Sequence, residues 1–234
     1  MCGRFIYYTA DSMALRFELD NLVPASYPPS YNVCPGQRSP VIYSSLGKRT
    51  WLPMTFGIAT SWSKSTMQGS SHHASGHPGP KAPVLINARA EKLLTAPTWR
   101  SLFPHNRCLI LANGFYEWQA DNHGGAGQPY LIRPTGLETF AFAGLYSSLP
   151  VPGETSTASF VIVTTTVSAQ MAGIHDRMPV ILEPAGEAAW LDSSKDTAQV
   201  IGQLRPFPGE LEVNPVTRDV NSPCNNHAAL IEPL

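Results

Sequence analysis

The chain has 234 residues, 43% of them hydrophobic and 14% charged, with a formal net charge of −1 at pH 7. This composition is that of a globular protein, and a chain of this length buries about 70–75% of its unfolded surface as one domain over residues 1–234. The sequence contains no apolar run of about 18 residues and no basic segment followed by an apolar one, so we expect a cytoplasmic protein without a membrane span.

Short hydrophobic runs, separated by many of the 22 prolines and 18 glycines, predict many short strands. In chain order we expect strands at Phe5–Tyr8, Val41–Tyr43, Thr50–Ile58, Val84–Asn87, Arg107–Ala112, Phe115–Gln119, Tyr130–Arg133, Phe140–Tyr146 and Phe160–Thr165. Helical signals cover Asp11–Asn21, Ala90–Ala96, Pro97–Phe103, Pro184–Leu191 and Thr197–Leu204. In the first helix, Leu15, Leu19 and Leu22 are spaced to form one buried face, and the C-terminal tail is predicted to be irregular.

These elements predict a single α+β domain, in which strongly bent antiparallel β-sheets form a barrel-like core with short flanking helices. The segment 63–83 is rich in Ser, Gly and His, which is typical of a flexible loop insert. Its histidines have no carboxylate or cysteine nearby, and the four cysteines of the chain form no close pair. We therefore expect neither a metal site nor a disulfide framework, and no cofactor.

Cys2 is the most informative single residue, because removal of Met1 would leave an α-amine and a thiol on the same residue. An α-amine titrates near pH 7.7–8.0, against about 10.4 for lysine, so far more of it is neutral and nucleophilic at pH 7. We expect the thiol to be partly ionised near neutrality, with any nearby positive charge increasing that share. Together the two groups can close a five-membered thiazolidine ring on one aldehyde carbon. Many proteins also begin with Met-Cys by accident.

Three further residues are candidates for chemistry. Glu117 on its strand faces the same side as Phe115, where burial among aromatic rings would raise its pKa toward neutrality; the alternative is an exposed carboxylate at a strand end. His175 lies on a predicted loop, where a structural role is the commoner one. Asn87 alternates with Ala88 and can point the same way as Arg89, although a strand-end amide and a surface cation are equally simple interpretations.

Ordered motifs lie along nearly the whole chain. They are Met1-Cys2-Gly3-Arg4-Phe5, Tyr31-Asn32-Val33-Cys34-Pro35-Gly36, Phe56-Gly57-Ile58 with Ser61-Trp62, Ile86-Asn87-Ala88-Arg89-Ala90-Glu91, Asn113-Gly114-Phe115-Tyr116-Glu117-Trp118, Ile174-His175-Asp176-Arg177-Met178-Pro179, and Pro215-Val216-Thr217 with Val220-Asn221. As an ordered set they resemble the motifs of the SOS response-associated peptidase (SRAP) family. Two features depart from the family pattern: Phe56 and Thr60 replace its usual Trp and Pro, and the 63–83 insert is unusually rich in Gly, Ser and His.

The resemblance implies an enzyme that senses abasic sites in single-stranded DNA and cross-links to them through Cys2 as a thiazolidine, by lyase-type Schiff-base chemistry. It also implies peptidase activity, most simply the removal of Met1 by the protein itself, which a host aminopeptidase would perform equally well. Asn87, Glu117 and His175 fall at the other active positions. Arg4, Arg89 and Thr164 fall where the family contacts DNA phosphates, and Trp62 is expected to stack on an unpaired base. The implied protein is a monomer that joins the nucleoid during DNA repair.

Two other classes of function remain open from the sequence. An N-terminal-nucleophile amidohydrolase of the glutamine amidotransferase type also begins Met-Cys-Gly, and Asn113-Gly114 partly matches its oxyanion motif, although its His-Thr-Arg-Trp signature is missing. A binder of single-stranded DNA without covalent chemistry would leave Cys2 incidental. The net charge of −1 does not by itself favour nucleic acid, but a local group of arginines is sufficient for binding.

Overall fold

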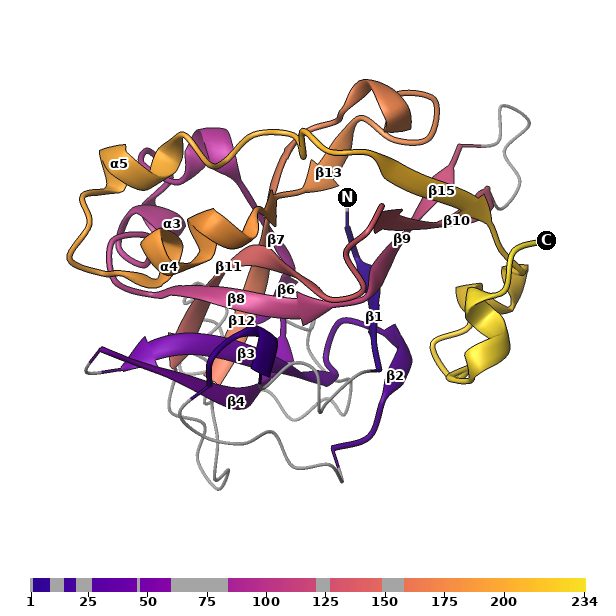
Figure 1. Ribbon diagram of the computed structural model, residues 1–234, viewed down its shortest axis with the longest axis horizontal. Coiled ribbons are helices and arrows are strands. Elements are labelled where there is room, and N and C mark those ends of the chain that lie inside the picture. The colour runs from indigo at the N-terminus through magenta and orange to yellow at the C-terminus, as the bar shows by residue number, and fades with distance from the viewer. Residues whose placement is uncertain are drawn as a thin grey trace, which may run out of the picture.

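The computed structural model describes residues 2–8, 15–19, 27–45, 47–59, 84–120, 127–148 and 158–234. Two β-sheets dominate this part of the chain, and short helices lie around them (Figure 1). The expected fold class, bent sheets with few and short helices, is confirmed. The 63–83 insert and Trp62 lie outside the described residues.

The smaller sheet carries the N-terminal residues of the chain. Its strand order is β15-β10-β9-β1-β2, and every pair in it is antiparallel. The strands are β1 (Arg4–Tyr7), β2 (Ser30–Val33), β9 (Gly114–Gln119), β10 (Gln128–Pro134) and β15 (Leu211–Pro215). Because β1 pairs with β9 in the register Arg4 with Tyr116, the residues just before β1 lie toward the Glu117 end of β9.

The larger sheet bends until its strands close into a ring, in the order β12-β4-β3-β8-β11 and back to β12. The ring strands are β3 (Arg38–Ser45), β4 (Lys48–Phe56), β8 (Arg107–Ala112), β11 (Phe140–Ser148) and β12 (Ala158–Thr166). Three short strands pair with the ring strands: β7 (Asn87–Arg89), β13 (Arg177–Pro179) and β14 (Ile181–Leu182). Two more, β5 (Ile58–Ala59) and β6 (Val84–Leu85), form a separate two-stranded sheet. The sheet is not wholly antiparallel as predicted, because β12 runs parallel to both β4 and β7.

The helices are short and lie at the periphery of the sheets. They are η1 (Ala90–Lys92), α3 (Pro97–Arg100), η2 (Ala169–Met171), α4 (Pro184–Leu191), α5 (Thr197–Ile201), η3 (Arg218–Asn221) and η4 (Ala228–Ile231). In Figure 1 the helices α3, α4 and α5 gather on one side, and the C-terminal segment lies on the other, near β2 and β15. None of the described helices has both the length and the apolar content to cross a membrane.

The core consists mainly of aromatic and branched side chains that alternate along the strands. Phe5 meets Phe56, Phe142 and Phe160 edge to face, with ring centroids 5.7 to 6.4 Å apart, so β1 is packed against the ring. Strand β9 separates two clusters, because Phe115 faces this core while Tyr116 belongs to a second cluster on the other side of the sheet. This alternation is the one that the sequence predicts around Glu117.

Several predicted elements differ in detail from the structure. Leu15 is 86% exposed rather than part of a buried face, and Phe17 is buried in its place; most of the expected helix lies outside the described residues. The helical signal at Ala90–Ala96 gives only the short η1. The tail expected to be irregular contains β15, η3 and η4. The sequence does not predict them because each has only four or five residues, too few to show a clear periodicity.

Candidate functional site

Asn87 holds Cys2 at the start of β1. The side-chain Nδ2 of Asn87 donates a hydrogen bond of 2.9 Å to the main-chain oxygen of Cys2. Asn87 begins β7, and it is fixed in turn by the parallel pairing of β7 with β12, in the register Asn87 with Ile162. The other amide atom, Oδ1, is buried and accepts no hydrogen bond from the described residues. Asn87 therefore anchors Cys2 and also presents a buried acceptor beside it.

The Cys2 thiol is fully buried. Burial raises the pKa of this thiol well above its usual range, and the nearby Glu117 carboxylate raises it further. The sequence-based expectation of a partly ionised thiol is therefore wrong for this environment, because desolvation and a negative neighbour both disfavour the thiolate. Cys2 presents a protonated S–H group at neutral pH.

Glu117 lies on β9, where its neighbour across the sheet is Tyr130 of β10. The residue is only 3% exposed, so the alternative of an exposed strand-end carboxylate does not apply. Burial raises the pKa of Glu117 to about 7, and the Asp176 carboxylate adds to the rise. At neutral pH this group exists in both protonation states, which suits a residue that passes protons back and forth.

His175 lies in the connection between η2 and β13. This connection rests against the end of β9, where Nε2 of Gln119 donates a 3.0 Å hydrogen bond to the oxygen of Gly173. The His175 side chain is 25% exposed, and its Nδ1 lies 3.0 Å from the main-chain nitrogen of Arg177 and 2.8 Å from Oδ1 of Asp176. Burial lowers the pKa of His175, while the Asp176 carboxylate acts in the opposite direction. The imidazole is therefore neutral at pH 7.

The fold thus brings the four candidate residues toward one region from four separate segments. Asn87 bonds Cys2 directly, and Glu117 acts on the Cys2 thiol through its charge. Asp176 connects the remaining pair, because its carboxylate shifts the pKa values of both Glu117 and His175. A nucleophile-bearing residue, a carboxyl group that titrates near neutrality and a neutral imidazole are the groups that proton-coupled addition to a carbonyl requires.

Arg4 has a structural role that its motif did not indicate. Its Nη1 donates to Oδ1 of Asn32 at 3.0 Å and to the oxygen of Val220 at 2.6 Å, and its Nη2 donates to the oxygen of Asn221 at 3.2 Å. The guanidinium also lies 5.7 Å from the ring centroid of Trp118. These contacts tie β1 to the C-terminal segment, and they leave fewer donors of Arg4 for DNA than the sequence suggests.

Arg89 and Thr164 are neighbours in the β7 and β12 register but differ in exposure. Arg89 ends β7 and is exposed, in keeping with a phosphate contact. Thr164 is fully buried, and its main-chain oxygen accepts a 2.6 Å hydrogen bond from Nη2 of Arg177. The same Nη2 also lies 3.4 Å from the Thr164 hydroxyl oxygen. Contact of Thr164 with DNA therefore stays a prediction.

Glu91 and Arg177 stand within the sequence motifs, which indicate no role for either residue. In the structure they form a two-bond ion pair beside His175, with distances of 2.9 and 3.0 Å. The signal available in the sequence was one acidic and one basic residue, each two positions after a candidate site residue, Arg89 and His175.

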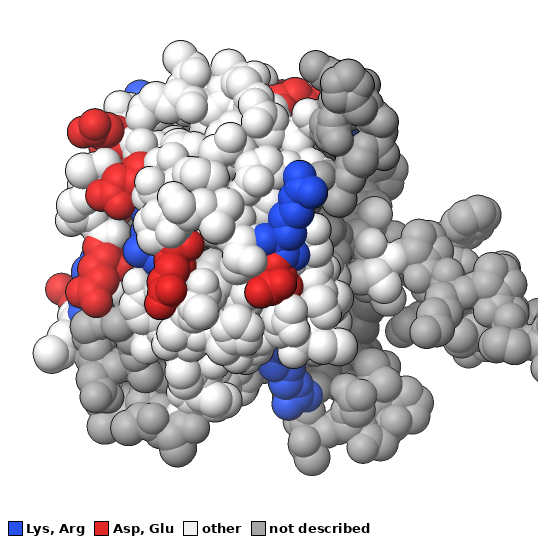
Figure 2. Space-filling view, turned by 90° about the vertical axis from the view of Figure 1, so that its right-hand side faces the viewer, with Lys and Arg blue, Asp and Glu red and all other residues white. Residues whose placement is uncertain are grey.

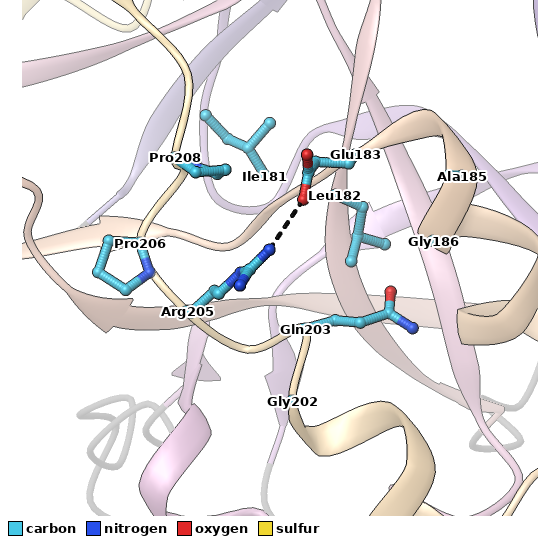
Figure 3. A pocket seen from close by; sticks show the side chains of 10 residues that line it. All are labelled: Ile181, Leu182, Glu183, Ala185, Gly186, Gly202, Gln203, Arg205, Pro206 and Pro208. Atoms are coloured by element: carbon cyan, nitrogen blue, oxygen red, sulfur yellow. Dashed lines mark hydrogen bonds and ion pairs between the residues drawn. The ribbon is translucent and has the colours of Figure 1, made fainter.

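Other surface features do not extend the site. A cavity of about 260 Å³ lies between α4 and the segment after α5, with the Glu183–Arg205 ion pair across it (Figure 3), and none of the candidate residues lines it. Among the described residues, the face in Figure 2 is largely uncharged, with acidic side chains mostly toward its left side and a few basic side chains nearer its middle. Within the described ranges, no group of three or more His, Cys, Asp and Glu residues is arranged to hold a metal ion.

Known proteins resemble this chain over its whole length. The abasic site processing protein YoqW of Bacillus subtilis strain 168 is 34% identical over 241 residues, which cover 99% of each chain. The abasic site processing protein YedK of Escherichia coli K12 is 29% identical over 244 residues, which cover 100% of each. A crystal structure of a protein from Bacteroides thetaiotaomicron has the same fold, with a TM-score of 0.79, 22% identity and complete coverage of both chains.

A family model described as SOS response associated peptidase (SRAP) matches residues 1–223. The match spans each of the segments that supply Cys2, Asn87, Glu117 and His175. On this match, and on the likeness to YoqW over nearly all of both chains, the chain belongs to the SRAP family.

Proposed function

We propose that the protein processes abasic sites in single-stranded DNA by forming a covalent cross-link through Cys2. The observation that carries the proposal is the placement of Cys2, whose main chain is held by Asn87 and whose thiol lies beside a carboxyl group with a pKa of about 7. Relatives named abasic site processing proteins, such as YoqW and YedK, support the choice of substrate.

The reaction begins with hydrolysis of the Met1–Cys2 peptide bond, which consumes one water and frees the Cys2 amine. The abasic sugar must also open, because its closed form carries no aldehyde. Ring opening breaks the bond between C1′ and the ring oxygen and transfers the proton of the C1′ hydroxyl to that oxygen. Glu117 accepts and returns this proton, and His175 stabilises the ring oxygen as the bond breaks.

The Cys2 amine then adds to the aldehyde carbon, and loss of one water gives an imine. Glu117 supplies the proton that the departing hydroxyl needs. The Cys2 S–H group finally adds across the C=N bond, sulfur to carbon and hydrogen to nitrogen, which closes the thiazolidine. Because the pKa of the thiol is raised, the amine is the better first nucleophile, and this order follows from the environment of Cys2.

Positioning supplies much of the rate, since a nucleophile held against its target has an effective molarity of order 10⁵ M or more. Asn87 provides this by holding the Cys2 main chain, and its buried Oδ1 is available to a hydroxyl of the sugar. Arg89 binds the flanking phosphates, together with those N–H donors of Arg4 that its contacts within the protein leave available. Trp62 stacks on an unpaired base. We propose that the protein acts on DNA as a monomer.

The amidohydrolase alternative is disfavoured by the surroundings of Asn113. In that class an Asn-Gly amide stabilises the oxyanion of the substrate. Here Oδ1 of Asn113 accepts from the main chain of Tyr8 at 2.8 Å, and Nδ2 donates to the oxygen of Glu138 at 2.7 Å and to Oγ1 of Thr139 at 3.2 Å. Through these bonds the Asn113 amide joins the ends of β1 and β9 to the turn before β11. The residue is only 1% exposed.

The test is a denaturing gel of the protein mixed with abasic single-stranded DNA and with intact DNA of the same sequence. We expect a resistant adduct only with abasic DNA, its loss in Cys2→Ala, and an undiminished adduct in Cys224→Ala, whose cysteine is exposed. An undiminished adduct in Cys2→Ala would overturn the assignment. Release of all bound DNA by denaturant would favour the non-covalent binder, and hydrolysis of glutamine alone would favour the amidohydrolase.

A further inference from the structure

Arg177 joins three elements next to His175. Its Nη1 and Nη2 donate to the two carboxylate oxygens of Glu91 at 2.9 and 3.0 Å, and Nη2 also donates to the main-chain oxygen of Thr164 at 2.6 Å. Glu91 belongs to η1, Thr164 to β12 and Arg177 itself to β13. The Arg177 side chain is 13% exposed, so this ion pair is shielded from solvent on the arginine side. A two-bond contact of this kind fixes orientation as well as distance.

The contact with Glu91 adds a side-chain bond to the short strand that carries Arg177. Strand β13 has three residues, lies at the end of its sheet and pairs only with β12 there. Its last residue, Pro179, has no N–H to donate. The Glu91–Arg177 ion pair therefore adds a side-chain bond at the first residue of a short edge strand, and this residue is the one that contacts His175.

Two contacts at Nδ1 of His175 demand opposite tautomers. The main-chain N–H of Arg177 points at Nδ1 from 3.0 Å, so Nδ1 must be an acceptor and the proton of the neutral ring must be on Nε2. Oδ1 of Asp176 lies 2.8 Å from the same atom, and a hydrogen bond there requires the proton on Nδ1. A neutral ring satisfies only one of these contacts at a time.

Of the two contacts at Nδ1, the one with the main-chain N–H of Arg177 determines the tautomer of His175 more strongly than the one with Asp176. The side chain of Asp176 is 86% exposed, so water competes with it, and exposed pairs of this kind contribute little. The N–H of Arg177 is a main-chain donor that must be satisfied inside the fold, and its position is set by the tie to Glu91 and Thr164.

We propose that Glu91 and Arg177 act as positioning residues that hold neutral His175 in the tautomer with its proton on Nε2. His175 then offers an N–H donor, rather than a lone pair, to the oxygen of the substrate. A neutral imidazole that polarises an oxygen in this way is an established catalytic device. The use of that donor at the sugar ring oxygen rests on the proposed function, whereas the tautomer itself does not.

Nitrogen-15 NMR of histidine-labelled protein at pH 7.5 tests the tautomer without any substrate. His175 is identified by the signals that disappear in His175→Ala. We expect a protonated Nε2 and an unprotonated Nδ1 in the starting protein and in Asp176→Ala, and a mixture of tautomers in Glu91→Ala. The matched control is Glu183→Ala, which breaks the exposed Glu183–Arg205 pair of 3.1 Å elsewhere and should leave the His175 signals unchanged.

Protonated Nδ1 in the starting protein would overturn the proposal, and so would a tautomer that follows Asp176→Ala but not Glu91→Ala. Single-turnover cross-linking extends the test to function. Glu91→Ala should be slowed about 10- to 100-fold on ring-closable abasic DNA and much less on an analogue that cannot close its ring. Equal slowing on both would remove the role in ring opening. A Cys2-independent adduct would overturn the proposed function but leave the NMR result standing.

Discussion

The amide Nδ2 of Asn87 donates a 2.9 Å hydrogen bond to the main-chain oxygen of Cys2, and this bond joins two segments that are 85 residues apart in the sequence. Its effect is to fix the residue that carries both proposed nucleophiles against β7, and through β7 against β12. Each residue of this arrangement can be replaced singly, and the effect on cross-linking rate or on stability can be measured.

Asn87→Ala should slow cross-linking about 100-fold at saturating DNA, because the nucleophile loses its orientation while both reactive groups stay present. The stability lost should be only about 1 kcal/mol, the net value of one hydrogen bond. Single-turnover rates and urea unfolding measure the two effects separately. Asn226→Ala is the matched control, because its Oδ1 accepts a 2.7 Å hydrogen bond from the main chain of Tyr31 at an exposed site. Equal rates for the two variants would contradict the anchoring role.

Glu117 should make the protein less stable as the pH rises from about 4.5 to about 7. Its pKa is raised from 4.5 to about 7 in the folded state, so between these values the folded state binds more protons than the unfolded state and the free energy of unfolding falls. Above pH 7 the raised pKa lowers the free energy of unfolding by at most about 3 kcal/mol. In Glu117→Gln this contribution disappears, so the variant should gain stability relative to the starting protein at pH 8 but not at pH 4.5. Urea unfolding at both pH values tests this, and parallel curves would contradict the raised pKa.

The Cys2 thiol should react slowly with iodoacetamide in protein that retains Met1, because it is fully buried and its pKa is raised. Cys224 is exposed and should be alkylated first. Peptide mass spectrometry over a time course gives both rates in the same sample. Glu117→Gln should speed the reaction of Cys2, because it removes the negative charge that disfavours the thiolate. A rate for Cys2 equal to that for Cys224 would contradict this description of the thiol.

Arg89→Ala and Arg4→Ala should have different effects although both remove a proposed phosphate contact. Arg89 is exposed, and its removal should weaken DNA association and reduce the salt slope by about 0.7 without loss of stability. Arg4→Ala should also destabilise the fold by about 2 kcal/mol or more, because three hydrogen bonds from a charged group to Asn32 and the C-terminal segment are lost. Fluorescence anisotropy at several salt concentrations, together with thermal unfolding, separates the two. Equal stability of both variants would contradict the structural role of Arg4.

The sequence predicts elements well where local signals agree. Strand β8 and helix α4 lie at the predicted residues, because apolar runs there are bounded by turn residues and, for α4, by Pro184 at its first position. The alternation of β9 places Glu117 on the same face as Phe115, but the sequence left open an exposed strand-end carboxylate, which only the structure rules out. What depends on distant partners was not available. Two of the three acceptors of Arg4, the main-chain oxygens of Val220 and Asn221, lie more than 200 residues away. The burial of Thr164 comes from β7 and β13, which pair with β12 on either side of it. The pKa of the Cys2 thiol likewise depends on Glu117, which only the fold brings near.

The central claim, a thiazolidine at Cys2, is tested most directly by tandem mass spectrometry of the peptide that remains joined to abasic single-stranded DNA after digestion. The predicted product has lost Met1, carries the sugar on Cys2 and has the combined mass of peptide and DNA less one water. It should be absent when an uncleavable extension precedes Cys2, since the amine is then an amide. A linkage at a lysine, or at Cys2 with Met1 still attached, would contradict the account.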